Sequence, residues 1–549
     1  MVKIGFNDNW KRIIAFIRNI VQNSLSSLIW ISVIGIMDVG ATLLFVWMSK
    51  TVIDTAVGEK EGSLLWYSVS LVGLLIAQIL LDAFDVQLRN MTKVHIENSI
   101  RQTLFSNLLY SKWLKLSNLH SGDTMTRLIR DCDDLVTTLV TGIPLILVAF
   151  AQLIGAFVFL SFLDFTLAII LVCILPLFLV CSKLYFHKMS YFSRKIKENE
   201  SFINSLLQES LMNQIVIRTF ERQDKELQRL DGLQNNLQVT ISGRTRITIF
   251  SRVMVMLSFG GGYIIAFLRG TFLLSLHQIS FGTLTAFLQL VGRIQNPLYN
   301  LMRFLPSLVA TKAALDRMIM LTSLEKEELC DPLVLDGKLR LCIEKVTYSY
   351  EGKMDSVLSE FSMTAEPGEM TAVIGETGAG KTTLLRLILA LVEPNQGKIE
   401  LDNGKKRVKV SPNTRSNFVY VPQGNTLFSG SIRGNLLVGN PYADEVQLRE
   451  VLEIAVAEFV YNLPYGLDTH INENGVGLSE GQAQRIALAR SLLRKGSVLL
   501  LDEATSSLDT ETEAQLLINL KKCLKNRTVL FITHHDVVAK ACDKVYRIV

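Results

Sequence analysis

The chain has 549 residues, of which 49% are hydrophobic and only 19% are charged, and its mean hydropathy is +0.31. This composition excludes a disordered protein, a fibrous repeat and a simple cytosolic enzyme. The net charge of +5 comes from 56 basic and 51 acidic residues, a balance that does not indicate a nucleic-acid partner. The seven cysteines are scattered, without the spacing typical of a zinc site or a disulfide framework.

The first 305 residues contain nearly all of the long uncharged runs. Residues 1–23 mix charged and apolar side chains and contain no cleavage site, which predicts an interfacial amphipathic helix. Residues 24–315 then contain six stretches long enough to cross a bilayer as helices. These six stretches are approximately 24–48, 62–81, 135–163, 165–182, 248–268 and 281–305. The sequence therefore predicts an all-α six-helix transmembrane domain.

Basic residues are unevenly distributed among the connections between the predicted spans. They are frequent between the second and third spans and between the fourth and fifth, and rare in the short turns. Because basic connections tend to stay in the cytoplasm, we expect a multi-pass protein of the cytoplasmic (cell inner) membrane, with both termini and the C-terminal half in the cytoplasm. The long connections have a helical pattern that is polar outward, so the spans are expected to continue as helices beyond the bilayer.

The pattern changes after a charged linker at 316–335. From residue 336 to residue 549, short aliphatic and β-branched runs alternate with helical stretches, which is typical of a parallel α/β sheet covered on both faces. One run, MTAVIGETGAGKTTLLRLILALV, predicts a strand, a glycine-rich loop and a helix in succession. The predicted fold class is therefore a helical transmembrane domain followed by an α/β phosphate-loop (P-loop) nucleotide-binding domain.

Within this run, Gly375, Gly378, Gly380, Lys381 and Thr382 match the spacing G-x-x-x-x-G-K-[ST]. The glycines allow backbone amides to surround a phosphate chain, the lysine neutralises β/γ-phosphate charge, and the threonine hydroxyl can ligate Mg²⁺. A chance glycine-rich turn is the alternative, and the flanking strand and helix argue against it. The predicted nucleotide-binding loop also includes Thr377, Ala379 and Thr383.

A second buried strand ends at Asp502, within the run SVLLLDEATSSLD. Ligands of parallel α/β sheets bind at the carboxyl ends of the strands, so Asp502 is expected to hold Mg²⁺, directly or through water. Glu503 would then polarise the attacking water as a general base. The alternative is that these two acids cap a helix, and the upstream phosphate loop argues against it.

The run LSEGQAQRIALARSLL, which precedes the Asp502 strand, resembles the signature sequence of ATP-binding-cassette (ABC) ATPases. Other motifs of that family occur in its order along the chain. The resemblance implies that Tyr350 stacks on adenine, that Gln423 contacts Mg²⁺ and signals to the membrane half, and that His534 contacts the γ-phosphate. Asp509, in SSLD, also matches a position of the family's ATP site.

The membrane half is similar to that of ABC exporters, with cytoplasmic coupling segments at about 115–135 and 205–222. In that family two chains pair head to tail, and each ATP lies between one chain's phosphate loop and the other chain's signature helix. The resemblance implies that Ser479, Gly481 and Gln482 contact the γ-phosphate. It also implies a homodimer or a pairing with a related half-transporter, contact with membrane lipid, and transport of a small molecule or peptide.

Two departures from the family pattern are present. Glu480 stands where the second signature residue is usually glycine, which leaves open a heterodimer with one weakened ATP site. The chain also ends at Val549, soon after His534, so the terminal strand and helix usual in the family are expected to be missing, either naturally or because the chain was shortened.

Polar residues within the predicted spans suggest a substrate path, because such residues are costly in a membrane. Gln289, Arg293, Asn296 and Asn300 recur on one face of the sixth span. Asp38 interrupts the first span and Gln152 the third. We interpret these residues as lining a hydrated cavity; the alternative is a structural pair of Arg293 with Asp38 plus helix–helix hydrogen bonds.

The leading hypothesis is ATP-driven export, by alternating access, of an amphipathic substrate, with a small peptide favoured and a drug or lipid next. A lipid flippase is included among the alternatives. A gated channel is disfavoured by the intact Glu503, and an importer's separate ATPase subunit is disfavoured by the fused spans. A metal or haem exporter lacks a supporting His/Cys cluster.

Overall fold

The computed structural model describes residues 6–117, 124–125, 127–328, 331–350, 355–376, 378–472, 477–523 and 526–548. The chain forms two compact units. Unit 1 comprises Met1–Leu109 and His120–Ser323, and unit 2 comprises Tyr110–Leu119 and Leu324–Val549. The short segment at Tyr110 therefore belongs to the same unit as the C-terminal half of the chain.

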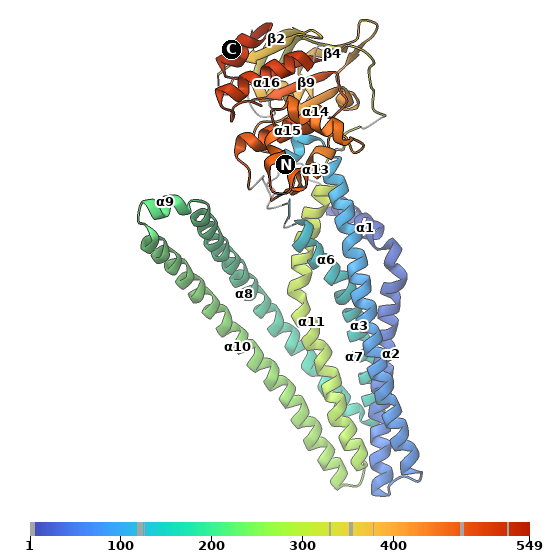
Figure 1. The fold of residues 1–549 in the computed structure, drawn as a ribbon. Helices are drawn as coiled ribbons and strands as arrows, with labels where there is room; N and C mark the ends of the chain where they lie inside the picture. The colour runs from blue at the N-terminus through green and yellow to red at the C-terminus, as the bar shows by residue number, and fades with distance from the viewer. Residues whose placement is uncertain are drawn as a thin grey trace. The chain divides into compact units, whose positions relative to one another are not determined.

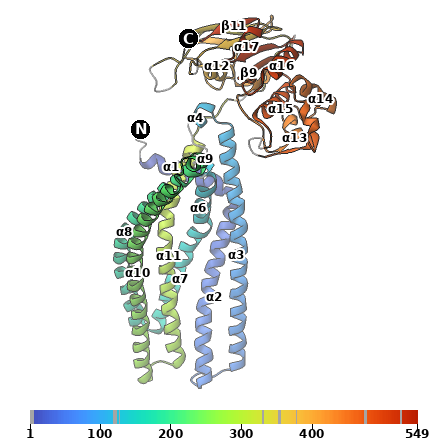
Figure 2. The ribbon, with the colours of Figure 1, turned by 60° about the vertical axis from the view of Figure 1, so that its left-hand side comes forward.

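Unit 1 is helical throughout the described residues, and long helices dominate it (Figures 1 and 2). The long helices are α2 (Leu25–Val57), α3 (Leu64–Leu109), α7 (Ile143–Leu163), α8 (Phe165–Met212), α10 (Gln223–Ser275) and α11 (Phe281–Thr322). The short ones are α1 (Phe6–Val21), α6 (Cys132–Thr137) and α9 (Gln214–Thr219). At 1.5 Å per residue the 53-residue α10 is ~80 Å long, far more than the ~30 Å hydrocarbon core of a bilayer.

Four helical stretches of the described residues are long and apolar enough to cross a membrane. They are Ala15–Val57, Leu64–Leu109, Arg127–Leu163 and Gln223–Ser275. The predicted fourth span overlaps residues 171–187, whose side chains lie outside the described part of the structure. The predicted sixth span lies in α11, where Arg293 and several amides lower the hydropathy. These two spans stay predictions.

The α7–α8 hairpin shows how the sequence sets the turns of unit 1. Asp164 has an extended backbone, and its Oδ1 accepts hydrogen bonds from the amides of Thr166 and Leu167, which caps the start of α8. Arg269 of α10 forms an ion pair with the same carboxylate at 2.6 Å. Nearby, Leu160 and Phe287 are fully buried in an apolar cluster that joins α2, α7, α8, α10 and α11.

The predicted linker at 316–335 starts too early. The helix α11 continues to Thr322, because Met318 and Leu321 are fully buried and keep the helical face packed beyond residue 315. The border between the two units follows at Ser323.

Unit 2 is an α/β domain, which confirms the predicted fold class. Its strands are β1 (Arg340–Tyr348), β2 (Leu358–Ala365), β3 (Met370–Ile374), β4 (Gln396–Asp402), β5 (Arg407–Lys409), β6 (Phe418–Val421), β7 (Gly430–Ser431), β8 (His470–Ile471), β9 (Val498–Asp502), β10 (Thr528–Ile532) and β11 (Lys544–Arg547). Its helices are α4 (Trp113–Ser117), α12 (Lys381–Ile388), α13 (Ile432–Leu437), α14 (Glu445–Ile454), α15 (Glu480–Leu492), α16 (Thr510–Cys523) and α17 (Asp536–Ala541).

The central sheet of unit 2 is parallel and has the strand order β11-β3-β10-β9-β6. The strands β9 and β10 are buried along their whole length, as their unbroken aliphatic sequences predict. A second, antiparallel sheet has the order β2-β1-β4-β5, and β7 pairs with β8.

The residues that follow His534 complete the central sheet. The residues after His534 form α17 and then β11, which adds to the edge of the central sheet beside β3.

Candidate ATP-hydrolysis site

Four neighbouring strands of the central sheet deliver the predicted site residues. The phosphate loop follows β3, His534 follows β10, Asp502 ends β9 and Gln423 follows β6. Because β3, β10, β9 and β6 are adjacent and parallel, their carboxyl ends share one edge of the sheet. Motifs that are far apart in the sequence are thus assembled at one place by the strand order.

The phosphate loop has the backbone that its glycines predict. Gly378 and Gly380 have φ angles of +92° and +101°, in the left-handed region that favours glycine. A Cβ atom on Gly380 would also lie 2.8 Å from the carbonyl oxygen of Val357. The helix α12 starts directly after Gly380, so its free first-turn amides are available to phosphate oxygens.

Lys381 is the first residue of α12 and is buried. Its Nζ donates hydrogen bonds to the carbonyl oxygens of Gly375 at 2.7 Å and Glu376 at 3.2 Å. These bonds hold the ammonium group against the loop, where it can reach a phosphate. Thr382 is exposed in the same turn, and the predicted site residue Thr377 lies outside the described residues.

Glu503 occupies the centre of the edge. Its carboxylate accepts a hydrogen bond from Nε2 of Gln423 at 2.6 Å and lies 3.0 Å from Nδ1 of His534. Its backbone has φ 46°, a strained value of a kind that is concentrated at functional sites. The amide of Gln484, a residue that we did not predict, holds the Glu503 carbonyl at 2.9 Å. Two groups thus hold the carboxylate of Glu503, and a third holds its strained backbone.

Asp502 is 5% exposed, and Oδ2 accepts a hydrogen bond from the hydroxyl of Tyr420 at 3.2 Å. Burial, together with the charge of Glu503, raises the pKa of the Asp502 carboxyl. Burial and the neighbouring Asp502 likewise raise the pKa of Tyr420. Burial makes the negative charge of Asp502 unfavourable. A bound cation would stabilise the ionised carboxylate, so Asp502 is well placed to bind one.

The donor set fits Mg²⁺. Asp502, Thr382 and Gln423 offer only oxygen ligands from their carboxylate, hydroxyl and amide groups, and Mg²⁺ is usually held by one or two carboxylates plus substrate phosphates and water. The described residues contain no group of three His, Cys, Asp or Glu side chains that would form an all-protein metal site. The metal would neutralise phosphate charge during hydrolysis.

The signature helix α15 begins with a capping box. Oγ of Ser479 accepts from the amide of Gln482, whose Oε1 accepts from the amide of Ser479. A Cβ atom on Gly481 would lie 2.6 Å from the carbonyl oxygen of Ser507, so this position requires glycine, whereas Glu480 is exposed. The unusual glutamate is therefore compatible with the fold and adds negative charge at the helix start.

Two further predicted residues have clear local roles. Asp509 caps the start of α16 by accepting from the amide and hydroxyl of Thr512 at 2.9 and 2.8 Å, and these hydrogen bonds lower its pKa. The hydroxyl of Tyr350 lies 3.1 Å from Oγ1 of Thr383 in α12 and accepts a hydrogen bond from Arg386 at 2.8 Å. Tyr350 is thereby tied to the helix that follows the phosphate loop, and it packs against the same apolar core as Ala379.

The predicted cavity residues of unit 1 are not gathered by hydrogen bonds. Gln289 donates to the hydroxyl of Ser49 in α2 at 3.3 Å, so one member of the stripe joins two helices. Within the described part of the chain, Arg293 and Asp38 form no ion pair within 4.0 Å, but their charges lie close enough to interact, so the structural pair stays an alternative. Asn296 and Asn300 are exposed and Gln152 is half-buried.

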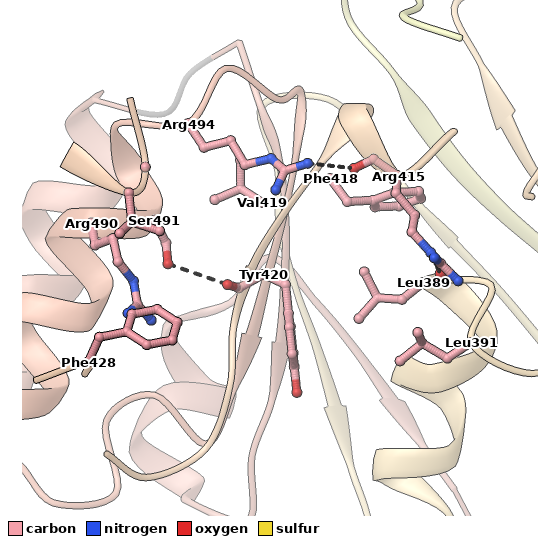
Figure 3. A pocket seen from close by; sticks show the side chains of 12 residues that line it. Leu389, Leu391, Arg415, Phe418, Val419, Tyr420, Phe428, Arg490, Ser491 and Arg494 are labelled. Carbon is pink, nitrogen blue, oxygen red and sulfur yellow. Dashed lines mark hydrogen bonds between the residues drawn. The ribbon is translucent and has the colours of Figure 1, made fainter. Parts of the chain in front are cut away.

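Unit 2 also contains a groove of about 450 Å³ between the β6 edge of the sheet and the ends of α12, α13 and α15 (Figure 3). We call this the unit 2 groove. Its lining includes Tyr420, Phe428, Val438, Arg490 and Arg494. Phe428 lies beside Arg490, whose guanidinium donates to the Thr426 carbonyl at 2.8 Å. The lining therefore combines apolar surface with positive charge.

A phosphate-loop ATPase unit and a unit of long apolar helices in one chain define an ATP-driven membrane transporter. The chain belongs to the ABC transporter family: the model of the ABC transporter transmembrane region matches residues 28–298, and the ABC transporter model matches residues 358–506. It has half-transporter architecture and is an ATPase coupled to transport.

Similar proteins agree with this assignment. The chain is 28% identical over 531 residues to a protein of Rickettsia prowazekii named as an export ATP-binding/permease protein, covering 94% of this chain and 90% of that one. It is 29% identical over 464 residues to an ATP-dependent lipid A-core flippase of Pseudomonas fluorescens, covering 82% and 75%. A solved bacterial Atm1-family ABC exporter with ATP bound has the same fold, with a TM-score of 0.80, 20% identity and coverage of 96% and 94%.

Proposed function

We propose that this chain is one half of a dimeric exporter of the cytoplasmic membrane, with ATP bound at the carboxyl edge of the unit 2 sheet. The observation that carries the proposal is the meeting of Gln423, Glu503 and His534 beside the phosphate loop. In this assignment Lys381 and Thr382 bind the phosphates and Mg²⁺, and Tyr350 stacks on adenine. Asp502 and Gln423 complete the Mg²⁺ ligands, and Glu503 activates water with His534 at the γ-phosphate.

The chemistry of the site supports this division of roles. A general base must lie near the attacked phosphate and must be ionised, and Glu503 is a carboxylate held in place by two polar neighbours. Positioning and electrostatic stabilisation are the main means by which proteins accelerate phosphoryl transfer. We infer that Ser479 and Gly481 of a second copy, together with its Asp509, complete the site from the other side.

We propose a dimer because one chain has one phosphate loop and one signature helix. The exposed apolar side chains at α9 support this: Met212, Ile215 and Phe220 are 78%, 82% and 69% exposed. We propose that α9 of each copy docks in the unit 2 groove of the other. Because Arg218 and Arg222 offset Glu209 and Glu221 beside α9, the proposed docking rests on these exposed apolar side chains.

Crosslinking tests this assembly. In a chain whose seven native cysteines are replaced and that carries Ile215→Cys and Val438→Cys, a short bifunctional maleimide should join two chains, because Val438 lines the groove and is 59% exposed. We expect a covalent dimer on a denaturing gel from the double variant, and from a mixture of the two single variants, but not from either single variant alone. If the crosslinked protein runs at the mass of a single chain, α9 does not dock on a second copy. The departure at Glu480 would then favour a related half-transporter as the partner.

We propose an amphipathic substrate with amide or anionic groups, a small peptide first. The support is the chemistry of α11, where Arg293 interacts with the charge of Asp38 without a direct ion pair and lies one and two turns from the exposed Asn296 and Asn300. Amphipathic lipid is the second candidate, because lipid A-core flippases are among the similar proteins.

The substrate proposal predicts a selective effect of Arg293→Met, which removes the charge and keeps the length of the side chain. We expect the concentration of substrate that half-maximally stimulates ATP hydrolysis to rise by roughly 10- to 100-fold, as for the loss of one charge-assisted hydrogen bond. The measurement is the ATPase rate of purified protein in lipid against panels of peptides, lipids and drugs. The exposed Arg229→Met is the matched control. An unchanged response would exclude Arg293 from the binding surface, and loss of folded protein in both Arg293→Met and Asp38→Asn would favour a structural role.

A further inference from the structure

A chain of contacts in unit 2 connects the segment after α3 with the predicted adenine-binding tyrosine. The guanidinium carbon of Arg386 lies 4.5 Å from the ring centroid of Trp113. NH1 of the same guanidinium donates to the hydroxyl of Tyr350 at 2.8 Å, and that hydroxyl lies 3.1 Å from Oγ1 of Thr383. Arg386 therefore contacts an indole ring on one side and a phenol on the other.

The segment that carries Trp113 is fixed within unit 2. The amide of Lys112 donates to the carbonyl of Glu325 at 2.9 Å, and the amide of Glu327 donates to the carbonyl of Tyr110 at 2.8 Å. Glu327 in turn forms two hydrogen bonds with the guanidinium of Arg415, at 2.6 and 2.9 Å. Trp113 also packs against the same apolar core as Tyr350. The contact of Trp113 with Arg386 is thus supported on both sides.

Only an arginine can make both of the contacts that Arg386 makes. A planar guanidinium can place its face over an aromatic ring and still donate from its edge, whereas an ammonium group is a point charge. No salt bridge with a carboxylate involves Arg386 among the described residues. Its direct contacts are with the Trp113 ring and the Tyr350 hydroxyl, and its charge also acts on Asp502 and Tyr420. The loss of either direct contact is expected to disturb the other.

We propose that Arg386 is a positioning residue for Tyr350. Through Trp113 and Arg386, residues 110–117 then control the part of the ATP affinity that comes from the adenine base. The inference rests on the proposed ATP site. The Tyr350 ring is already fixed edge-on against Tyr348, with centroids 5.0 Å apart and an interplanar angle of 84°. Holding its hydroxyl fixes the remaining freedom of the ring, and a preorganised ring binds a base at lower entropic cost.

The coupling works in both directions. If docking of residues 110–117 orders Tyr350 for adenine, then adenine binding must stabilise the docked segment by the same free energy. In this proposal Tyr350 acts on the base, so we expect triphosphate binding at the phosphate loop to depend little on it. A comparison of ATP with inorganic tripolyphosphate therefore separates the base-dependent part of affinity from the rest.

The test uses the full chain with Glu503→Gln as background, so that ATP is not consumed, and titration calorimetry with ATP and with tripolyphosphate. We expect Arg386→Gln to weaken ATP binding by roughly 5- to 30-fold and Trp113→Leu by roughly 2- to 5-fold. The loss for tripolyphosphate should be clearly smaller, because it reflects only the charge of Arg386 near Asp502. Arg386→Lys should resemble Arg386→Gln, and Trp113→Phe should restore affinity. The double variant should be no weaker than Arg386→Gln alone.

Two results would overturn the inference: unchanged ATP affinity in Arg386→Gln, or an equal loss for ATP and tripolyphosphate. Tyr350→Ala separates this failure from failure of the proposed function. If Tyr350→Ala weakens ATP binding and Arg386→Gln does not, the inference alone is wrong. If Tyr350→Ala has no effect, the assignment of Tyr350 to the base is wrong, and the inference with it.

Fluorescence gives a second readout that a purely structural role would not change. The chain has five tryptophans, and all except Trp113 lie at residues 10, 30, 47 and 66. With those four replaced by phenylalanine, we expect ATP but not tripolyphosphate to change the emission of Trp113. This change should disappear in Arg386→Gln. If the single-tryptophan chain responds to ATP identically with and without Arg386→Gln, the proposed connection is wrong.

Discussion

Replacing Glu503 with glutamine is expected to lower the rate of ATP hydrolysis by roughly 10²- to 10⁴-fold, the contribution of a positioned general base. Glutamine has the same shape and can keep the contacts with Gln423 and His534, at 2.6 and 3.0 Å. It cannot accept a proton from water at neutral pH. ATP binding should persist, because the phosphate loop and Asp502 are unchanged, and ATP-bound dimers should accumulate.

The measurement is phosphate release by purified protein in lipid, together with the affinity for ATP. Glu513→Gln is a suitable control, because Glu513 is a buried carboxylate of the same unit that lies 3.6 Å from Nδ1 of His535 and not at the phosphate loop. It should hydrolyse ATP at close to the normal rate. Hydrolysis within a few-fold of normal in Glu503→Gln would instead show that another group activates the water.

The parts of the site that the sequence predicts are those fixed by local pattern and by strand order. A buried aliphatic run followed by Asp502, or by the phosphate loop, identifies both the strand and the functional residue at its end. Parallel strands share a carboxyl edge, so proximity follows even though β3 and β9 are far apart in the sequence. This logic needs no knowledge of side-chain contacts.

The contacts that the sequence does not predict join segments with no shared pattern. Tyr420 carries the polar side chain of the otherwise apolar β6, so its hydroxyl could have been identified as an inward polar group. Its partner Asp502, however, follows only from the pairing of β6 with β9. The contact of Trp113 with Arg386 depends on a segment at 110–117 that belongs to unit 2, while the chain on either side of it belongs to unit 1. Helix periodicity alone gives no reason for that division.

The signature helix shows a third case, in which the sequence identifies a departure but not its consequence. Glu480 replaces a glycine of the family pattern, and the sequence leaves open whether the backbone can accept it. In the structure, the neighbouring positions 480 and 481 differ in the space they leave for a side chain. Gly481 lies against the Ser507 carbonyl and has no room for a side chain, whereas Glu480 is exposed at the first turn of α15. The fold therefore accepts Glu480, and a weakened ATP site stays a prediction.

Lys381→Met should act on nucleotide binding, in contrast to Glu503→Gln. Methionine preserves the length and packing of this buried side chain but removes the charge that would neutralise the β- and γ-phosphates. Loss of a charge-assisted hydrogen bond predicts a fall in ATP affinity of roughly 10- to 100-fold, with hydrolysis lost as a result. The same substitution also removes the Nζ hydrogen bonds to the carbonyl oxygens of Gly375 and Glu376.

The loss of the Nζ hydrogen bonds to Gly375 and Glu376 determines how the experiment on Lys381→Met is designed. In the wild-type chain the two carbonyl groups compete with phosphate for the same ammonium group, so the measured fall in affinity is smaller than the full strength of a lysine–phosphate contact. The loss of both bonds predicts a stability decrease of about 1–2 kcal/mol, which thermal unfolding would detect. The exposed Lys405→Met is the control, because it removes the same charge from a turn outside the site. Unchanged ATP affinity in a folded Lys381→Met chain would refute the role of Lys381. An equal loss of affinity for ATP and for tripolyphosphate would show that Lys381 acts on the phosphates and not on the base.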